Sequence, residues 1–119
     1  MKTWILLIVM VLGQFGCSKS LGEPPLTLPV GAEPSAKMRN DIGVEHYQAG
    51  RYWDAVLQFN QANFADPTSG EIHFNLGLAY FQEGKKEKAL KNFRKAQKLA
   101  RGNPKILKSP LLSELLQEN

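Results

Sequence analysis

The sequence predicts an all-α fold: two helical hairpins followed by a terminal capping helix. Three observations predict it. Apolar residues recur at spacings of three and four, as amphipathic helices require, and many residues match the residue 34 positions later. Gly50 and Gly84 also stand where the first helix of each pair should end in a left-handed residue. We expect helices over residues 36–49, 52–65, 70–83 and 86–101.

The internal repeat supports each of these helices. Identical residues separated by 34 positions include Gly43 and Gly77, Gly50 and Gly84, Ala55 and Ala89, Phe59 and Phe93, and Ala62 and Ala96. A fixed period between 20 and 50 residues indicates stacked repeats. The small residues would let two helices approach closely, while the phenylalanines fill the space between neighbouring hairpins. Thr68 and Glu71 have the spacing of a capping box at the start of the third helix.

The repeated pattern resembles the tetratricopeptide repeat (TPR). The second copy contains Leu76-Gly77-x-x-Tyr80 and then Ala89-x-x-x-Phe93 with Ala96, and the first contains Ile42-Gly43-x-x-His46, Ala55-x-x-x-Phe59, Ala62 and Pro67. The resemblance implies two helix-turn-helix repeats, over residues 36–69 and 70–103, in a short α-solenoid. It also implies a non-enzymatic scaffold that binds another protein or a peptide segment.

The tail, residues 104–119, is expected to form a capping helix. Ser109 suits an N-cap and Pro110 the first helical position. An apolar stripe follows, formed by Leu111, Leu112, Leu115 and Leu116. This stripe would cover the exposed side of the second repeat. The alternative is a helix that dimerises the chain or binds a partner.

The N-terminus, residues 1–16, has the pattern of a secretory signal peptide. Lys2 supplies a positive charge, residues 4–12 form an apolar run, and Gly13 ends it. This run is too short to span a bilayer, which needs about 20 apolar residues. The alternative is an uncleaved anchor.

Cys17, the single cysteine, directly follows the signal pattern, and Gln14-Phe15-Gly16-Cys17 resembles the cleavage box of bacterial lipoproteins. The resemblance implies a lipid-modified Cys17 and a membrane anchor. In that family a serine such as Ser18 goes with transport to the outer membrane, facing the periplasm. The alternative is ordinary cleavage after Ser18 and secretion.

Residues 17–35 are expected to tether the domain to its anchor. The stretch contains Pro24, Pro25, Pro29 and Pro34 without helical spacing. As an extended spacer it could reach roughly 55 Å at about 3.1 Å per residue. Its apolar residues exceed what a spacer needs, so part of it docking on the domain is the alternative: Leu21, Leu26, Leu28 and Val30.

Catalytic and cofactor sites are not indicated. One cysteine excludes an intramolecular disulfide, and the two histidines lack metal-ligand spacing. We expect His46 to pack inward and His73 to be solvated. A net charge of +4 is weak for a nucleic-acid binder of this size. We therefore expect no enzyme, cofactor, metal or nucleic acid.

The expected binding surface is the concave face, which the first helix of each TPR lines. The resemblance places eight residues there: Asn40, Val44, Tyr47, Gln48, Phe74, Leu78, Phe81 and Gln82. Chaperone-binding TPRs hold a peptide carboxylate with a lysine and two asparagines. Asn75 matches one asparagine, but Asn40 and Val44 replace the other two residues, so this clamp is not expected. Instead an apolar groove would take an extended or amphipathic segment, unless the chain's own tether or tail fills it. Replacing Leu78 and Phe81 with serine should then spare the fold.

The alternative binding surface is basic. Lys88, Lys91, Lys95 and Lys98 share one face of the second helix of repeat 2. They could bind anionic lipid or an acidic envelope polymer. An ordinary solvated helix face, with cations favouring its C-terminal end, explains the same pattern.

Overall fold

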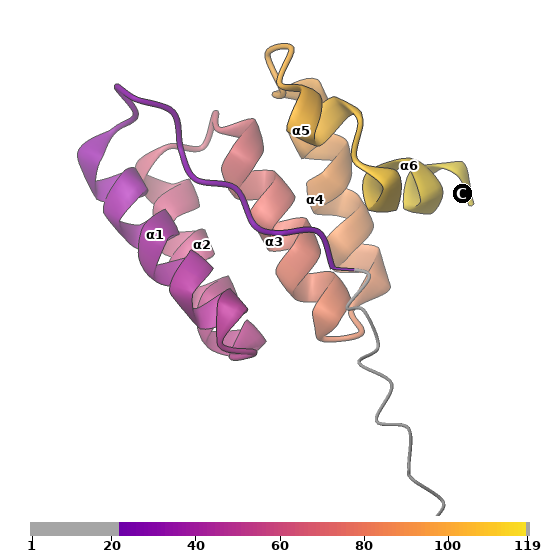
Figure 1. Cartoon of the computed structure of the whole chain (residues 1–119), viewed down its shortest axis with the longest axis horizontal. Coiled ribbons are helices and arrows are strands. Elements are labelled where there is room, and N and C mark those ends of the chain that lie inside the picture. The colour runs from indigo at the N-terminus through magenta and orange to yellow at the C-terminus, as the bar shows by residue number, and fades with distance from the viewer. Residues whose placement is uncertain (1–21, 119) are drawn as a thin grey trace, which may run out of the picture.

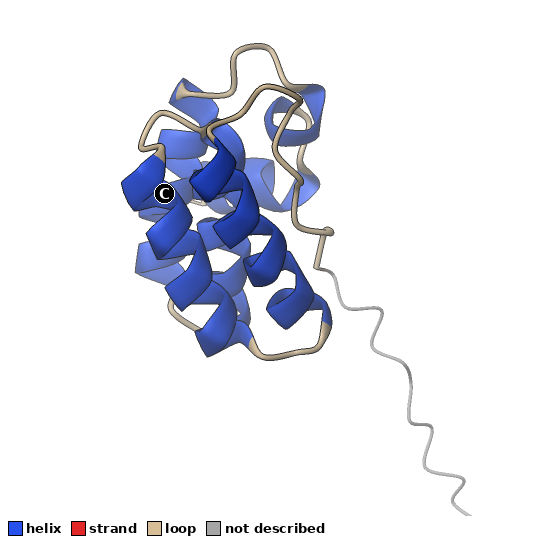
Figure 2. Cartoon of the chain, turned by 90° about the vertical axis from the view of Figure 1, so that its left-hand side faces the viewer, coloured by secondary structure: helices blue, strands red, loops and turns tan. Residues whose placement is uncertain are grey.

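The computed structural model describes residues 22–118, which form six helices joined by loops, with no strand among them (Figures 1 and 2). The helices are α1 (Pro34–Gln48), α2 (Tyr52–Ala65), α3 (Gly70–Gln82), α4 (Lys86–Lys98), α5 (Pro104–Leu107) and α6 (Pro110–Gln117). α1 pairs with α2 and α3 with α4, and the two hairpins stack mainly through α2 and α3. The predicted all-α solenoid is confirmed.

The turns inside both hairpins use glycine as the spacing predicts. Gly50 has a φ angle of 76° and Gly84 one of 75°. The left-handed region is strained for residues with a Cβ, which explains glycine at both positions.

The start of α3 differs from the predicted capping box. Ser69, not Thr68, is the N-cap, and its hydroxyl accepts a hydrogen bond from the Ile72 amide at 3.2 Å. Thr68 instead bonds to the Asp66 carboxylate through its amide at 3.0 Å and its hydroxyl at 2.7 Å. The carboxylate of Asp66 thus orders the turn before the helix and moves the cap by one residue.

Two other helix boundaries also differ from the expectation. α1 begins at Pro34, because Glu33 caps the helix by accepting from the Ala36 amide at 2.6 Å. α4 ends at Lys98 instead of residue 101, and the chain turns through Arg101 (φ 49°) and Gly102 (φ 79°). The short helix α5, which periodicity did not predict, follows this turn.

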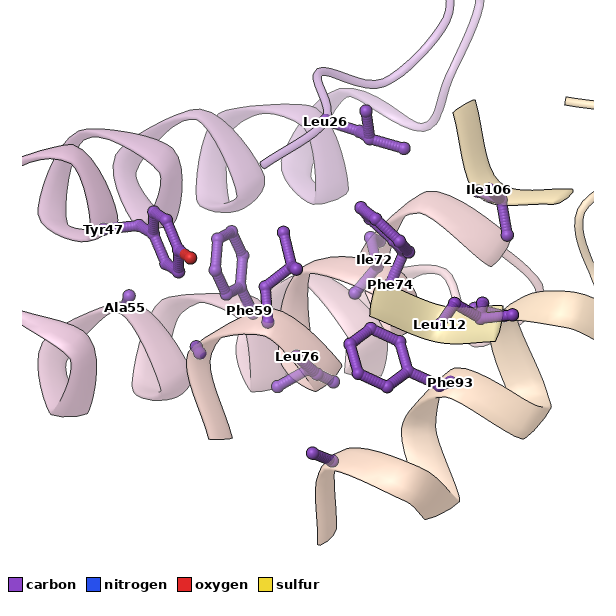
Figure 3. Close-up of a cluster of buried hydrophobic side chains, with 14 of the residues drawn as sticks. Leu26, Tyr47, Ala55, Phe59, Ile72, Phe74, Leu76, Phe93, Ile106 and Leu112 are labelled. Carbon is purple, nitrogen blue, oxygen red and sulfur yellow. The ribbon is translucent and has the colours of Figure 1, made fainter. Parts of the chain in front are cut away.

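The core follows the paired glycine and phenylalanine positions of the repeat. Figure 3 shows the two rings, Phe59 and Phe93, among the buried side chains. A Cβ added at Gly43 would lie 2.5 Å from the Phe59 ring, and one added at Gly77 would lie 2.6 Å from the Phe93 ring. Both rings are fully buried. Each glycine therefore makes room for the ring of its own hairpin.

The tail caps the second hairpin, as predicted. Ser109 accepts from the Leu112 amide at 3.1 Å and starts α6 with Pro110 in the first turn. α6 packs on α4, burying Leu112 and Leu115, while Ile106 of α5 is also buried. None of the helices within residues 22–118 is long and apolar enough to cross a bilayer.

Candidate functional site

The concave face holds an extended segment of the chain itself. Residues 22–33, here called the strap, run from the α6 end of the domain to the start of α1 (Figure 1). Leu26 and Leu28 are only 8% and 6% exposed and belong to the hydrophobic core. In Figure 3 Leu26 lies above the side chains of Ile72 and Phe74.

Two buried asparagines hold the strap by its backbone. The Asn75 amide accepts from the Leu26 N–H at 2.7 Å and donates to the Leu26 carbonyl at 2.8 Å. Asn40 donates to the same carbonyl at 2.9 Å, and Asn75 donates to the Asn40 oxygen at 2.8 Å. Both asparagines are fully buried. Since the bonded groups are main-chain atoms, this clamp recognises an extended backbone, not a carboxylate.

Both ends of the strap are fixed. At the α6 end, one carboxylate oxygen of Glu23 accepts from the Ser109 hydroxyl at 2.8 Å and from the Leu111 amide at 2.9 Å. At the other end, the Ala32 amide donates to the Pro29 carbonyl at 3.2 Å in a turn that leads into α1. The part of the expected tether described by the structure is therefore docked and not a free spacer.

The eight residues that were expected to line the groove differ in their exposure to solvent. Asn40, Tyr47, Phe74 and Leu78 are buried, Val44, Phe81 and Gln82 are partly buried, and Gln48 is exposed. Of the two alternatives, the structure shows the one in which the chain fills its own groove. Because Leu78 is fully buried, the expectation that its replacement by serine spares the fold is wrong.

Tyr47 is the one ionisable residue of this face with a shifted pKa among those described. Burial raises the pKa of its phenol above the ordinary value, and a hydrogen bond from Gln82 to its oxygen, at 3.4 Å, opposes this in part. The ring also packs edge-on against Tyr52, with 5.1 Å between centroids. Tyr47 thus acts as a packed aromatic anchor between the two hairpins.

An open groove remains beside the strap. It has a volume of about 790 Å³ and lies between the strap, the first turns of α3 and the start of α5. Phe74, 1% exposed, contributes to its lining, while Glu71, Lys105 and Lys108 bring charged groups to it. Of the eight predicted residues, only Phe74 lines this groove. The residues added by the strap and α5 could not be found by alignment, because the repeat pattern does not include them.

One of the two histidines, His73, lies in a different environment from the expected one. His73 is 4% exposed, with its ring nitrogens 3.2 Å from the Asn92 side-chain oxygen and 3.4 Å from the Pro67 carbonyl. His46 is partly buried, and its Nδ1 accepts from Arg51 at 2.9 Å. His73 is therefore not solvated as expected: it bridges the end of α2 and α4. Residues 22–118 contain no cluster of three or more His, Cys, Asp or Glu that could hold a metal ion.

The predicted basic face is present on α4. Lys88, Lys91, Lys95 and Lys98 are all exposed. Lys88 lies over the Tyr80 ring, 5.5 Å from its centroid, and the other three form no ion pair within residues 22–118. This face is solvated and positively charged.

Comparison with family models agrees with this architecture. One tetratricopeptide repeat model matches residues 70–103, and a TPR repeat model matches residues 43–84. Residues 43–103 are tetratricopeptide repeats. This family generally acts as a non-enzymatic protein-interaction scaffold, and the TPR hairpins of this chain carry the concave face described above. A search of curated proteins gave no match to the chain.

Proposed function

We propose that the protein is a TPR scaffold at a bacterial envelope membrane, and that it binds an extended segment of a partner protein in the open groove beside the strap. The observation that carries this proposal is the groove of about 790 Å³ on the concave side. The clamped strap forms one wall of it. Seven consecutive strap residues, 23–29, line the groove along its length.

The strap-covered part of the concave face is closed to weak ligands. An intramolecular segment on a short connection acts at an effective concentration of about millimolar. A free segment with the same intrinsic affinity would therefore compete only at comparable concentrations. A partner binds more easily where the strap leaves space, which favours the groove between the strap and α5.

The chemistry of the open groove favours an extended, partly acidic partner segment. Lys105 and Lys108 are exposed along its α5 wall. Both carboxylates of the groove are already bonded: Glu23 accepts from Ser109 and the Leu111 amide, and Glu71 accepts from the Asn103 side-chain amide at 2.9 Å. Apolar contact would come from the proline rings of the strap, Pro24, Pro25 and Pro29. A segment with apolar residues and a carboxylate fits this combination.

The membrane anchor is supported by the sequence at Cys17, which lies outside the described residues. Glu23 is fixed against α6 and stands six positions after Cys17. Six residues span at most about 20 Å. A lipid on Cys17 would therefore hold the α6 end of the domain near the bilayer, much closer than the roughly 55 Å of an undocked tether. Metabolic labelling with a fatty-acid analogue should mark the chain, and the label should be absent from Cys17→Ser.

Position-specific photo-crosslinking in membranes tests the groove. A photo-reactive residue in place of Lys108 should capture the partner in the full-length lipoprotein. The same residue in place of Gln97, exposed on α4, is the matched control and should not. Capture from position 97 alone would contradict the groove as the partner site.

The second candidate function is binding of anionic lipid or polymer by α4, favoured by its exposed lysines without ion pairs in the described chain. Binding of this kind should weaken steeply with salt. Groove binding, which adds a carboxylate contact at Lys105 and Lys108 to apolar contact, should weaken less with salt. Binding to vesicles containing anionic lipid, measured at low and high salt, separates the two.

A further inference from the structure

The strap has one edge that the helices hold and one that they leave free. Leu26 and Leu28 are buried while Thr27 between them is exposed, which is the alternation of an extended segment. In such a segment the N–H and C=O groups of successive residues point to opposite edges. The main chain of Leu26 faces Asn75 and Asn40 and bonds to both. The main chain of Thr27 therefore faces the other edge.

The free edge of the strap borders the open groove. Strap residues 23–29 line this groove, whereas neither asparagine of the clamp does. The N–H and C=O groups of Thr27 form no hydrogen bond within residues 22–118. Pro25 and Pro29, which the alternation places on the same edge, have no N–H to donate. Thr27 is therefore the one residue of this edge, between positions 24 and 29, that offers both a donor and an acceptor.

The proline spacing makes this edge selective. A fully open strand edge accepts an added strand in several registers, and prolines are a common means of blocking an edge. Here the block is incomplete, because Thr27 keeps its main-chain groups between two prolines. One residue of an added strand can exchange both hydrogen bonds with Thr27, and the prolines on either side cannot donate to a second residue. The geometry thus fixes the register of an added strand.

The opposite wall of the groove supplies charge for a partner's side chains. Lys105 and Lys108 line it and form no ion pair within the described part of the chain. The groove's own carboxylates, Glu23 and Glu71, accept hydrogen bonds from other donors. A partner segment between the two walls therefore meets main-chain groups on one side and unpaired positive charge on the other.

We propose that the partner segment of the proposed function, on which this inference rests, binds as an added strand that pairs with the main chain of Thr27. Added strands gain affinity from main-chain hydrogen bonds and specificity from their side chains. Neighbouring strands lie about 4.8 Å apart, so the partner runs directly alongside the strap. Its residue opposite Thr27 is not proline, because a proline there could not donate to the Thr27 carbonyl.

Thr27→Pro tests the pairing in the full-length lipoprotein, with the photo-reactive residue at position 108. The substitution removes the Thr27 N–H, which the described chain does not use, and an extended backbone accepts a proline. Capture of the partner should fall at least about fivefold, because one hydrogen bond is lost and the partner's acceptor stays unpaired. Thr27→Ala is the matched control: it removes the exposed side chain but keeps both main-chain groups, so capture should be unchanged.

Hydrogen exchange shows whether the strap stays docked. The Leu26 amide should remain protected in Thr27→Pro, since its bond to Asn75 is untouched. If that protection is lost, the complex of the chain with Thr27 intact decides. Its Thr27 amide, which should exchange fast in the free chain, should become protected once the partner is captured at position 108. A Thr27 amide that exchanges equally fast in both states would overturn the proposal.

Two further outcomes overturn the pairing while leaving the groove as the partner site. One is undiminished capture in Thr27→Pro with the Leu26 amide protected. The other is an equal loss of capture in Thr27→Ala, which would assign the contact to the side chain. No capture from position 108 in the chain with Thr27 intact would instead contradict the groove itself, and the pairing with it. Failure of the pairing and failure of the groove therefore give different results.

Discussion

Asn75→Ala should detach the strap and lower the free energy of unfolding by about 2–4 kcal/mol. The substitution removes three hydrogen bonds of a fully buried side chain, two to Leu26 and one to Asn40. A buried hydrogen bond contributes about 0.5–1.5 kcal/mol net, and an unpaired buried group costs about 1–3 kcal/mol. The Leu26 carbonyl keeps its bond to Asn40, whereas the Leu26 N–H loses its partner.

The loss has an upper limit set by the strap itself. If the strap lifts, the unpaired groups regain water, and the cost becomes the burial lost by Leu26 and Leu28. Full burial of a leucine contributes about 1.5–3 kcal/mol. The two leucines are almost fully buried, which again gives a few kcal/mol.

Urea unfolding followed by circular dichroism measures the change in stability, and hydrogen exchange at the Leu26 amide reports the strap. The amide should become unprotected in Asn75→Ala while helix amides of α4 stay protected. Asn60→Ala, at an exposed position of α2, is the matched control and should change stability by less than about 0.5 kcal/mol. A similarly small change in Asn75→Ala, with the Leu26 amide still protected, would refute the clamp.

Three further predictions concern packing and pH. Gly77→Ala should destabilise the fold by about 1–3 kcal/mol, measured by thermal unfolding, because its Cβ would lie 2.6 Å from Phe93; an unchanged melting temperature would contradict this packing. Burial raises the pKa of the Tyr47 phenol. The stability that comes from burying the neutral phenol is therefore fully present below the ordinary pKa of 10.0 and is lost as the pH rises through the folded-state pKa. Ultraviolet titration, compared with Tyr47→Phe, should show that the Tyr47 phenol ionises at a higher pH than an ordinary tyrosine. The hydrogen bond from the Ala36 amide lowers the pKa of the Glu33 carboxyl. The cap therefore stabilises α1 fully above the ordinary pKa of 4.5, and this stabilisation is lost as the pH falls through the lowered, folded-state pKa. Glu33→Gln should flatten the acid dependence of the melting temperature, and an equal acid dependence in the wild type and the variant would contradict the assignment.

The helices could be predicted from sequence because their signals are local. Spacing of three and four places the apolar faces, and Gly50 and Gly84 mark the hairpin turns through their left-handed backbone. The 34-residue period further predicts that the two hairpins stack on each other. Errors of one to three residues arose where a neighbouring side chain decided the boundary, as when Asp66 bonded Thr68 and left Ser69 to cap α3.

The site could be predicted only in part, because it depends on contacts between distant residues. Leu26 is hydrogen-bonded to Asn75, which is 49 residues away in the sequence. Neither a helical nor a strand periodicity in the sequence predicts that contact. The two leucines of the strap were the available signal, since a free spacer needs no apolar residues. His73 was misplaced for the same reason: its first-turn position suggests solvent, but stacking of the hairpins brings the Pro67 carbonyl and Asn92 to its ring.

The strap also explains how so short an array can be stable. A TPR hairpin buries its faces against neighbours, and at least three repeats are usually required. Here the strap covers the concave side with Leu26 and Leu28, and α5 and α6 cover the tail. Within residues 22–118 these additions leave the groove beside the strap open. The strap therefore adds the burial that two hairpins alone lack, and the groove beside it is where we expect an extended partner segment to bind.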